Sequence, residues 1–232
     1  MAEMLSVRNL RIEVRVPQPH GSPTDLVLVD DVSFEVGKGK VLGLIGESGA
    51  GKSTIGLSAL AYGRDGVRFT GGQVLLDGDD IIKLDSRGIR SIRGIRVAYV
   101  AQSAAAAFNP GHKLGRQVVE ASVRHGTMTR AEAVKRAAYL FGVLGLPDPE
   151  SFGERYPHQV SGGQLQRAMT AMALCSKPEL IVFDEPTTAL DVTTQIEVLA
   201  AIKHAITETG TAALYITMTL PSSPRWLTIS WC

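Results

Sequence analysis

The sequence predicts an α/β fold with a mixed β-sheet and a helical insert. The uninterrupted apolar run Val41–Ile45 is typical of a strand buried on both faces, and it leads into a glycine-rich loop and a helix expected over 53–62. Residues 5–16 and 26–36 alternate apolar and polar side chains as antiparallel strands do. A second apolar run, Leu180–Asp184, predicts another buried strand.

The middle of the chain predicts helices. A helix is expected over 130–141 with Thr129 as its cap, ending before the Leu-Pro-Asp-Pro turn at 146–149, and another over 164–176. The stretch 102–115, rich in alanine and proline, predicts a flexible joint. We therefore expect one domain over 1–217, with the helical insert at roughly 103–170.

Residues 46–53 fit the phosphate-loop pattern G-x-x-x-x-G-K-[ST] and follow a predicted strand. Glycines let successive backbone N–H groups wrap a polyphosphate at a helix start. Lys52 then places its charge between the β- and γ-phosphates, and the Ser53 hydroxyl suits Mg²⁺. The alternative is a glycine-rich turn that only links strand to helix. The predicted nucleotide-binding residues are Gly46, Glu47, Ser48, Gly49, Ala50, Gly51, Lys52, Ser53 and Thr54.

The pair Asp184-Glu185 ends the second apolar run. Open parallel sheets bind ligands in the crevice beyond the carboxyl ends of their strands. Asp184 is therefore expected to hold Mg²⁺, and Glu185 to accept a proton from the attacking water or to orient it. The alternative is a solvated acidic turn.

Composition is that of one globular unit: 232 residues, 44% hydrophobic and 20% charged, with a formal net charge of +1. This near-neutral net charge does not indicate a nucleic-acid partner. No stretch is apolar for the length of a bilayer span, so we expect any membrane attachment to come through partners. Cys175 is expected to be a core thiol, and the histidines show no metal-ligand spacing.

Further motifs make the chain resemble a known family. Ser161, Gly162, Gly163 and Gln164 resemble the signature motif of ATP-binding-cassette (ABC) ATPases, and Gln102 resembles their Q-loop glutamine. With the two motifs above, the resemblance covers residues 5–217. It implies a P-loop NTPase core with an antiparallel β subdomain and an inserted α-helical subdomain. It also implies that Gln102 and Glu185 are catalytic residues, and that Gln102 is a Mg²⁺ ligand together with Ser53 and Asp184.

The strings at 156–159 and 185–193 resemble more closely the ATPase subunits of oligopeptide, dipeptide and nickel importers. That resemblance implies ATP hydrolysis coupled to peptide import at the cytoplasmic face of the inner membrane, as a peripheral subunit. The implied partners are a second ATPase subunit, identical or different, two transmembrane permeases and an extracytoplasmic substrate-binding protein. The signature would cover ATP on the partner ATPase in trans, and Asp191 would lie in the D-loop between the two sites.

Two departures from the family stand out. Val14 takes the place of an aromatic residue that stacks on adenine, and Met218 takes the place of the switch histidine that contacts the γ-phosphate. The tail 218–232 shows no helix or strand period, and one inserted base before Met218 would restore a family-like His-Asp. We therefore expect an out-of-frame tail and a cassette cut short after Thr217, the alternative being a genuinely divergent C-terminus.

The sequence leaves other functions open. A non-transport ABC ATPase of DNA repair or translation usually carries a coiled coil or a second cassette, and this chain has neither a heptad run nor a second phosphate loop. A degenerate cassette that binds ATP without efficient turnover is a further alternative. The cargo, whether oligopeptide, dipeptide or nickel, cannot be read from the chain.

Overall fold

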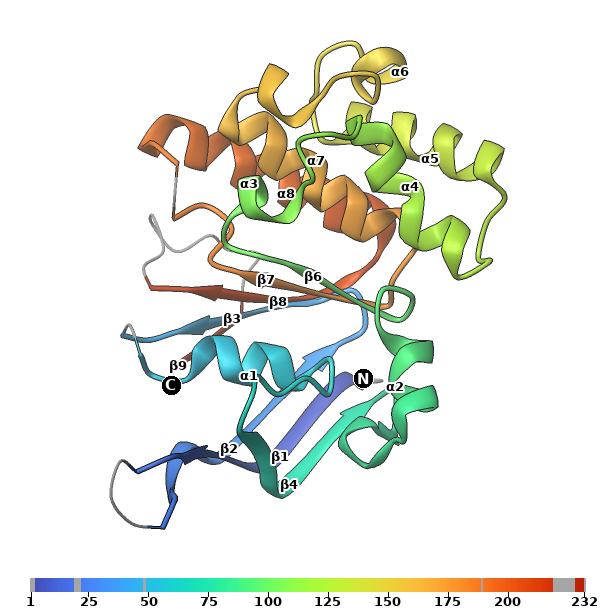
Figure 1. Cartoon of the computed structure of the whole chain (residues 1–232). Helices are drawn as coiled ribbons and strands as arrows, with labels where there is room; N and C mark the ends of the chain where they lie inside the picture. The colour runs from blue at the N-terminus through green and yellow to red at the C-terminus, as the bar shows by residue number, and fades with distance from the viewer. Residues whose placement is uncertain (1–2, 19–21, 48, 189, 219–227, 232) are drawn as a thin grey trace. The chain divides into compact units, whose positions relative to one another are not determined.

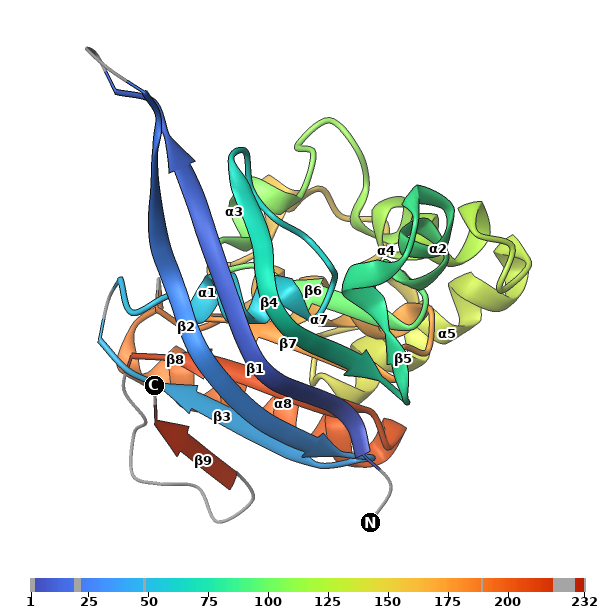
Figure 2. The same ribbon diagram turned by 90° about the horizontal axis from the view of Figure 1, so that it is seen from below.

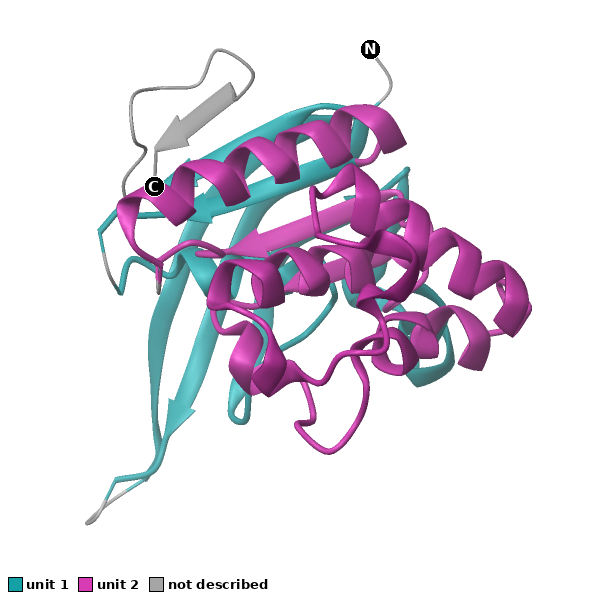
Figure 3. Ribbon diagram, turned by 90° about the horizontal axis from the view of Figure 1, so that it is seen from above, with its two compact units in different colours: residues 1–92, 212–232 teal, residues 93–211 magenta. Residues whose placement is uncertain are grey.

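The computed structural model describes residues 3–18, 22–47, 49–188, 190–218 and, as backbone only, 228–231. The chain divides into two compact units, shown in different colours in Figure 3. Unit 1 comprises residues 1–92 and 212–232, and unit 2 comprises residues 93–211.

Unit 1 contains an antiparallel sheet of long, curved strands, seen along their length in Figure 2. The sheet has the order β2-β1-β4-β5, and the predictions of strands at 5–16 and 26–36 are confirmed with small extensions. The first part of β1 is buried on both faces, from Met4 to Val7, whereas Leu10 and Ile12 farther along are buried between more exposed side chains. The strands are β1 (Glu3–Val16), β2 (Thr24–Gly37), β4 (Val67–Leu76) and β5 (Asp79–Asp80).

Strand β3 (Val41–Ile45) is buried at all five residues and runs parallel to β8 (Ala212–Thr217), as its apolar run predicts. Among the described residues, the antiparallel pairings of β1 and the parallel pairing of β3 with β8 belong to different sheets. The expectation of one mixed sheet was therefore wrong, whereas the α/β class with an antiparallel β subdomain is confirmed. Strand β9 (Thr228–Trp231) pairs in parallel with the other edge of β3. The expectation of no strand in the tail was wrong here, because edge pairing uses backbone N–H and C=O groups that any sequence supplies.

Helix α1 (Lys52–Ser58) follows the glycine-rich loop but is shorter than the predicted 53–62. From Ala59 the backbone bonds tighten, since Ala59 N–H donates to Gly56 O and Ala61 N–H to Ser58 O. Ala61 then adopts a φ of 49°, so the chain does not continue as a helix beyond this turn. Unit 1 also holds the short helices η1 (Ile81–Lys83) and α2 (Ser86–Ile92).

Unit 2 has two parallel strands and a group of helices around α7 (Figure 1). Helix α7 packs against α3, α4, α5 and α8, and its face toward them is almost entirely buried. The prediction of a buried Cys175 is confirmed, and burial raises the pKa of its thiol. The elements are β6 (Val97–Val100), α3 (Ala104–Ala107), α4 (Leu114–Arg124), α5 (Arg130–Val143), α6 (Pro149–Phe152), η2 (Pro157–Gln159), α7 (Gly162–Cys175), β7 (Leu180–Asp184) and α8 (Val192–Thr209).

Helices α5 and α7 are joined by two arginines. Arg136 of α5 donates from Nε to Cys175 O and from Nη2 to Leu174 O, at 3.0 and 3.1 Å. Arg167 of α7 donates from Nη1 to Leu144 O and Gly145 O, at 3.2 and 2.8 Å. Each guanidinium therefore meets the carbonyl end of the other helix, where a cation is favoured. Partial burial lowers the pKa of both arginines.

The predicted joint at 102–115 is not a structureless connection. It contains α3, capped by the side chain of Ser103, and a turn held by Gln117. The side-chain Oε1 of Gln117 accepts a hydrogen bond from Asn109 N–H at 2.8 Å, and its Nε2 donates to Asn109 O and His112 O. Composition missed this order because it depends on one side chain of the next helix. Within the described residues, no helix is both long and apolar enough to cross a membrane.

The capping box of α5 makes a pH-dependent contribution to stability. Hydrogen bonds from the Thr129 hydroxyl and backbone hold the pKa of Glu132 below its ordinary value of 4.5. A lowered folded-state pKa stabilises the fold above about pH 4.5, and that stability is lost as the pH falls through the folded value. We expect the unfolding free energy of the wild type to exceed that of Glu132→Gln by a constant amount near neutrality and to converge with it on acidification. Denaturant titrations at several pH values measure this, and a gap that widens on acidification would contradict it.

Candidate functional site

The phosphate loop in unit 1 wraps around a buried lysine. Lys52 is only 4% exposed, and its Nζ donates to Gly46 O at 2.8 Å and to Glu47 O at 2.5 Å. Neither acceptor is charged, and within the described residues Lys52 forms no ion pair. A buried ammonium without a counter-charge is costly, so the loop suits an anionic ligand. Ser48 lies outside the described residues.

Two glycines give the loop its course. Gly49 and Gly51 have φ values of 84° and 78°, which side chains rarely adopt. A Cβ on Gly51 would lie 2.8 Å from Leu28 O and 3.3 Å from Val29 Cγ2, so the loop also lies directly against β2. No side chain caps α1 at Gly51, and its first turn has no acidic residue. This helix start therefore favours an anion, as phosphate groups require.

Two adjacent carboxylates of unit 2 lie at the end of β7, where the sequence predicts them. Asp184 is 6% exposed, and its Oδ2 accepts a hydrogen bond from the Tyr99 hydroxyl at 2.5 Å. Glu185 is half-buried with a φ of 49°, and its Oε2 accepts from Thr188 Oγ1 at 3.2 Å and from Gln102 Nε2 at 3.4 Å. The structure thus brings Gln102, Asp184 and Glu185 into one cluster. Ser53, the other predicted Mg²⁺ ligand, belongs to unit 1.

Sequence reasoning missed Tyr99 and Thr188. A tyrosine in a short apolar strand resembles any core aromatic, and only the pairing of β6 with β7 brings its hydroxyl to Asp184. Thr188 stands in the string 185–193 that was singled out, but its bond to Glu185 depends on the positive φ of that residue. For Tyr99, the information that the sequence does not supply is the register between two strands that are far apart in the chain.

The signature residues open α7 through a capping box. Ser161 Oγ accepts from Gln164 N–H at 3.2 Å, while Ser161 N–H donates to Gln164 Oε1 at 3.0 Å. Gly163 is buried, and a Cβ on it would lie 2.5 Å from Thr194 Cγ2 of α8. Gly162 has more room, with Leu190 Cδ2 at 3.4 Å. The second signature glycine is therefore required by packing of α7 on α8.

Asp191 caps the helix that meets the signature. Its carboxylate accepts from Thr194 N–H at 3.0 Å and from Thr194 Oγ1 at 2.6 Å. These bonds, led by that of the Thr194 hydroxyl, lower the pKa of Asp191. Thr194 is also the residue against Gly163, so the predicted D-loop residue and the signature share one neighbour.

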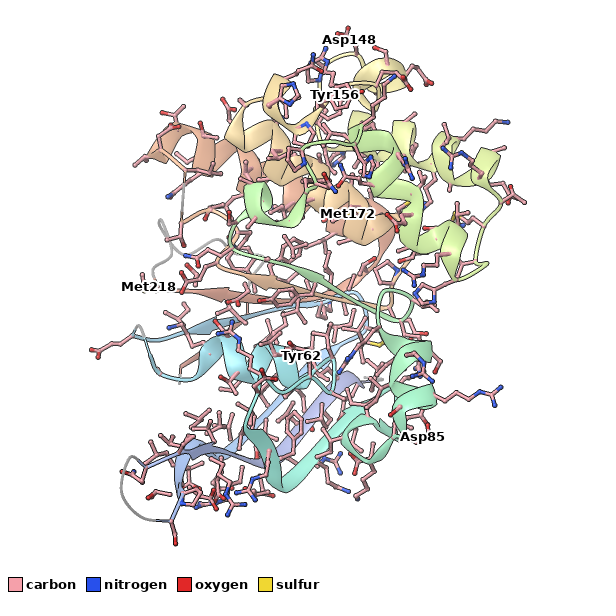
Figure 4. The ribbon with its side chains drawn as sticks, viewed as in Figure 1. Tyr62, Asp85, Asp148, Tyr156, Met172 and Met218 are labelled. Carbon is pink, nitrogen blue, oxygen red and sulfur yellow. The ribbon has the colours of Figure 1, made fainter. Side chains whose placement is uncertain are left out.

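The two departures from the family lie in unit 1. Val14 pairs with Leu26 of β2 and Val67 of β4, so aliphatic side chains occupy this part of the sheet. Met218 follows the cross-strand pair Ile45↔Thr217, at the end of β8, where Figure 4 labels it. It stands therefore beside the start of the phosphate loop, and it is 42% exposed. Thr219, and the tail residues through 227, lie outside the described residues.

A family model described as "ABC transporter" matches residues 29–188. The chain belongs to the ABC transporter family. The match includes the phosphate loop, Gln102, the signature and both carboxylates.

Individual members of the ABC transporter family are similar over most of the chain. A "Probable peptide ABC transporter ATP-binding protein y4tR" of Sinorhizobium fredii is 40% identical over 90% of this chain and 63% of its own length. The dipeptide transport ATP-binding protein DppD of Bacillus subtilis is 35% identical over 94% of this chain and 64% of its own. The chain thus spans less than two thirds of the length of these relatives.

Solved structures agree on the ABC fold. The post-hydrolysis dimer of the ATP-binding cassette MJ0796, bound to ADP and phosphate, has a TM-score of 0.76 at 25% identity, covering 93% of this chain and 88% of its own. The cbiO1 protein of Clostridium perfringens has a TM-score of 0.80 at 20% identity, covering 99% and 85%, which shows the fold alone. The expected cassette fold is confirmed.

The contact between Gly163 and Thr194 predicts unequal roles for the two signature glycines. Gly163→Ala should lower the free energy of unfolding by about 1–3 kcal/mol, because the new methyl group overpacks the α7–α8 contact. Gly162→Ala, one residue away, is the matched control and should cost far less. Adding Thr194→Ser to Gly163→Ala removes the opposing Cγ2 atom but keeps the hydroxyl that bonds Asp191. Denaturant unfolding that shows no rescue by Thr194→Ser would contradict the steric cause.

Proposed function

We propose that this chain is the ATP-binding and ATP-hydrolysing subunit of an ABC importer for peptides. The observation that carries the proposal is the phosphate loop, in which the buried Lys52 ammonium donates to two neutral carbonyl oxygens and forms no ion pair with the residues that the structure describes. Membership of the ABC transporter family and the names of the peptide-transport relatives support the rest.

The site residues receive separate roles in this proposal. Lys52 and the loop N–H groups bind the β- and γ-phosphates. Ser53, Gln102 and Asp184 hold Mg²⁺, an ion that prefers oxygen ligands and neutralises charge on the phosphates when bound. Glu185 accepts a proton from the attacking water or orients it, with Gln102 and Thr188 holding its carboxylate. With an aliphatic residue at position 14, adenine stacking contributes less to affinity.

The proposed partners follow the family. This chain would pair with a second ATPase subunit, identical or different, and its signature residues would cover the ATP bound to that subunit. The signature residues are Ser161, Gly162, Gly163 and Gln164, and Asp191 would lie between the two ATP sites. Two permeases and an extracytoplasmic binding protein would complete an importer, with this chain peripheral at the cytoplasmic face of the inner membrane. The relatives' names range from dipeptide transport to a metal-staphylopine import system of Staphylococcus aureus, so the cargo is proposed only as a peptide or peptide-like compound.

Lys52→Ala tests the phosphate-binding role. Loss of a charge-assisted contact to phosphate should weaken MgATP binding about tenfold to a hundredfold. Lys38→Ala is the control, since Lys38 is an exposed lysine of the same unit that pairs with Asp77. Isothermal titration calorimetry measures both variants. Wild-type affinity in Lys52→Ala would rule out the proposed site.

A second candidate is a cassette that binds ATP without efficient turnover. Met218 favours it, because this residue stands beside the start of the phosphate loop and has neither a hydrogen-bond donor nor a titratable group. In the family, a histidine at this place contacts the γ-phosphate. The two candidates share ATP binding and differ only in the rate of hydrolysis.

Met218→His separates these candidates. Loss of one transition-state contact typically costs about a hundredfold to a thousandfold in rate, so restoring the histidine should raise kcat by at least about tenfold. Met218→Gln controls for polarity alone. Adding Glu185→Gln should abolish the gain, because it removes the proposed base. Phosphate release under saturating MgATP gives the rates. A wild-type rate that equals that of Met218→His and is abolished by Glu185→Gln would favour efficient turnover without a histidine.

A further inference from the structure

Asp184 is held by a residue outside the motifs described so far. The Tyr99 hydroxyl donates to Asp184 Oδ2 at 2.5 Å, a short bond of the kind that ionised acceptors form. Asp184 is 6% exposed and Tyr99 is half-buried. Both residues belong to unit 2. The contact therefore lies inside one compact unit, with the carboxylate buried and the tyrosine half-buried.

Strand register explains the contact. In the parallel pair β6–β7, Tyr99 lies opposite Val182, and Val100 opposite Phe183. Side chains alternate along a strand, so Asp184 lies on the same face as Val182, one diagonal step from Tyr99. Diagonal neighbours are about 7–8 Å apart at their backbones, a gap that long aromatic side chains span. The tyrosine side chain is long enough to cross this gap, and its hydroxyl group supplies one hydrogen-bond donor at the far end.

The end of β6 is fixed from a second side. Gln166 of α7 is 3% exposed, and its Nε2 donates to Ala101 O at 3.4 Å. Gln102, the next residue, donates to Glu185. The short stretch 99–102 thus contacts both carboxylates at the end of β7, Asp184 and Glu185, and also helix α7. Movement of Tyr99 relative to Asp184 is restricted by this anchoring.

We propose that Tyr99 is a positioning residue, whose hydroxyl holds the Asp184 carboxylate in the orientation that binds the divalent cation. This inference rests on the proposed function, in which Asp184 is a Mg²⁺ ligand. A phenol adds no charge, so it orients the carboxylate without neutralising it. Groups that hydrogen-bond a ligating carboxylate typically change metal affinity about tenfold to a hundredfold when removed. Tyr99 is expected to act on the metal and not on the phosphates.

Tyr99→Phe removes only the hydroxyl and is the test. Mn²⁺, a spectroscopic substitute for Mg²⁺, is titrated into the full chain with saturating ATP and followed by electron paramagnetic resonance. We expect Mn²⁺ to bind about tenfold more weakly to Tyr99→Phe than to wild type. ATP affinity measured with EDTA should be unchanged, which a general loss of structure would not allow. The control is Tyr139→Phe, which removes a tyrosine–carboxylate bond of the same kind, from Tyr139 to Glu208 at 3.0 Å, on the surface of unit 2.

The outcomes are distinguishable. Wild-type Mn²⁺ affinity in Tyr99→Phe, or an equal loss in Tyr139→Phe, would overturn the positioning role and leave the proposed function intact. A parallel loss of metal-free ATP affinity or of folding in Tyr99→Phe would show a structural role instead and also overturn it. A wild-type protein that binds ATP but no Mn²⁺ would overturn both the positioning role and the assignment of Asp184 as a ligand.

Discussion

The buried ammonium of Lys52 is the constraint on which unit 1 depends. Burying a charge without a counter-ion opposes folding, and the loop offsets this cost only partly through the two carbonyl groups of Gly46 and Glu47. The surrounding strands must therefore hold the loop closed without a ligand. Strand β3 supplies a fully buried base, and β2 contacts Gly51 directly. A polyphosphate would supply the missing charge, so the site and the stability of the unit are physically linked.

In unit 2 the corresponding constraint is the placement of two adjacent carboxylates. Asp184 and Glu185 are adjacent in the chain and contact different partners, and the backbone at Glu185 is left-handed, with a φ of 49°. Such a conformation costs a residue with a side chain about 1–2 kcal/mol, and it persists where neighbours enforce it. Here Thr188 and Gln102 are those neighbours.

Much of the fold was readable from local sequence. Strands β3 and β7 are continuous apolar runs, and the caps Thr129 and Ser161 each stand three residues before a Glu or Gln. The elements that sequence reasoning left out, including β4, α4 and α8, depend on tertiary packing that no local pattern reports. The role of Tyr99 was missed for the same reason, because its contact with Asp184 depends on the register between β6 and β7. The out-of-frame tail, the domain limits and the individual site roles stay predictions.

The reciprocal arginine bonds between α5 and α7 have a mechanical consequence. Arg136 and Arg167 each join the body of one helix to the C-terminal end of the other, and each bond is made to backbone carbonyls that cannot swing away as side chains do. The pair therefore resists sliding and should behave as a stiff lever. A displacement of α5 would therefore carry α7 with it, including Ser161 at its start. Such stiffness is what a part that transmits force between a nucleotide and a distant partner requires.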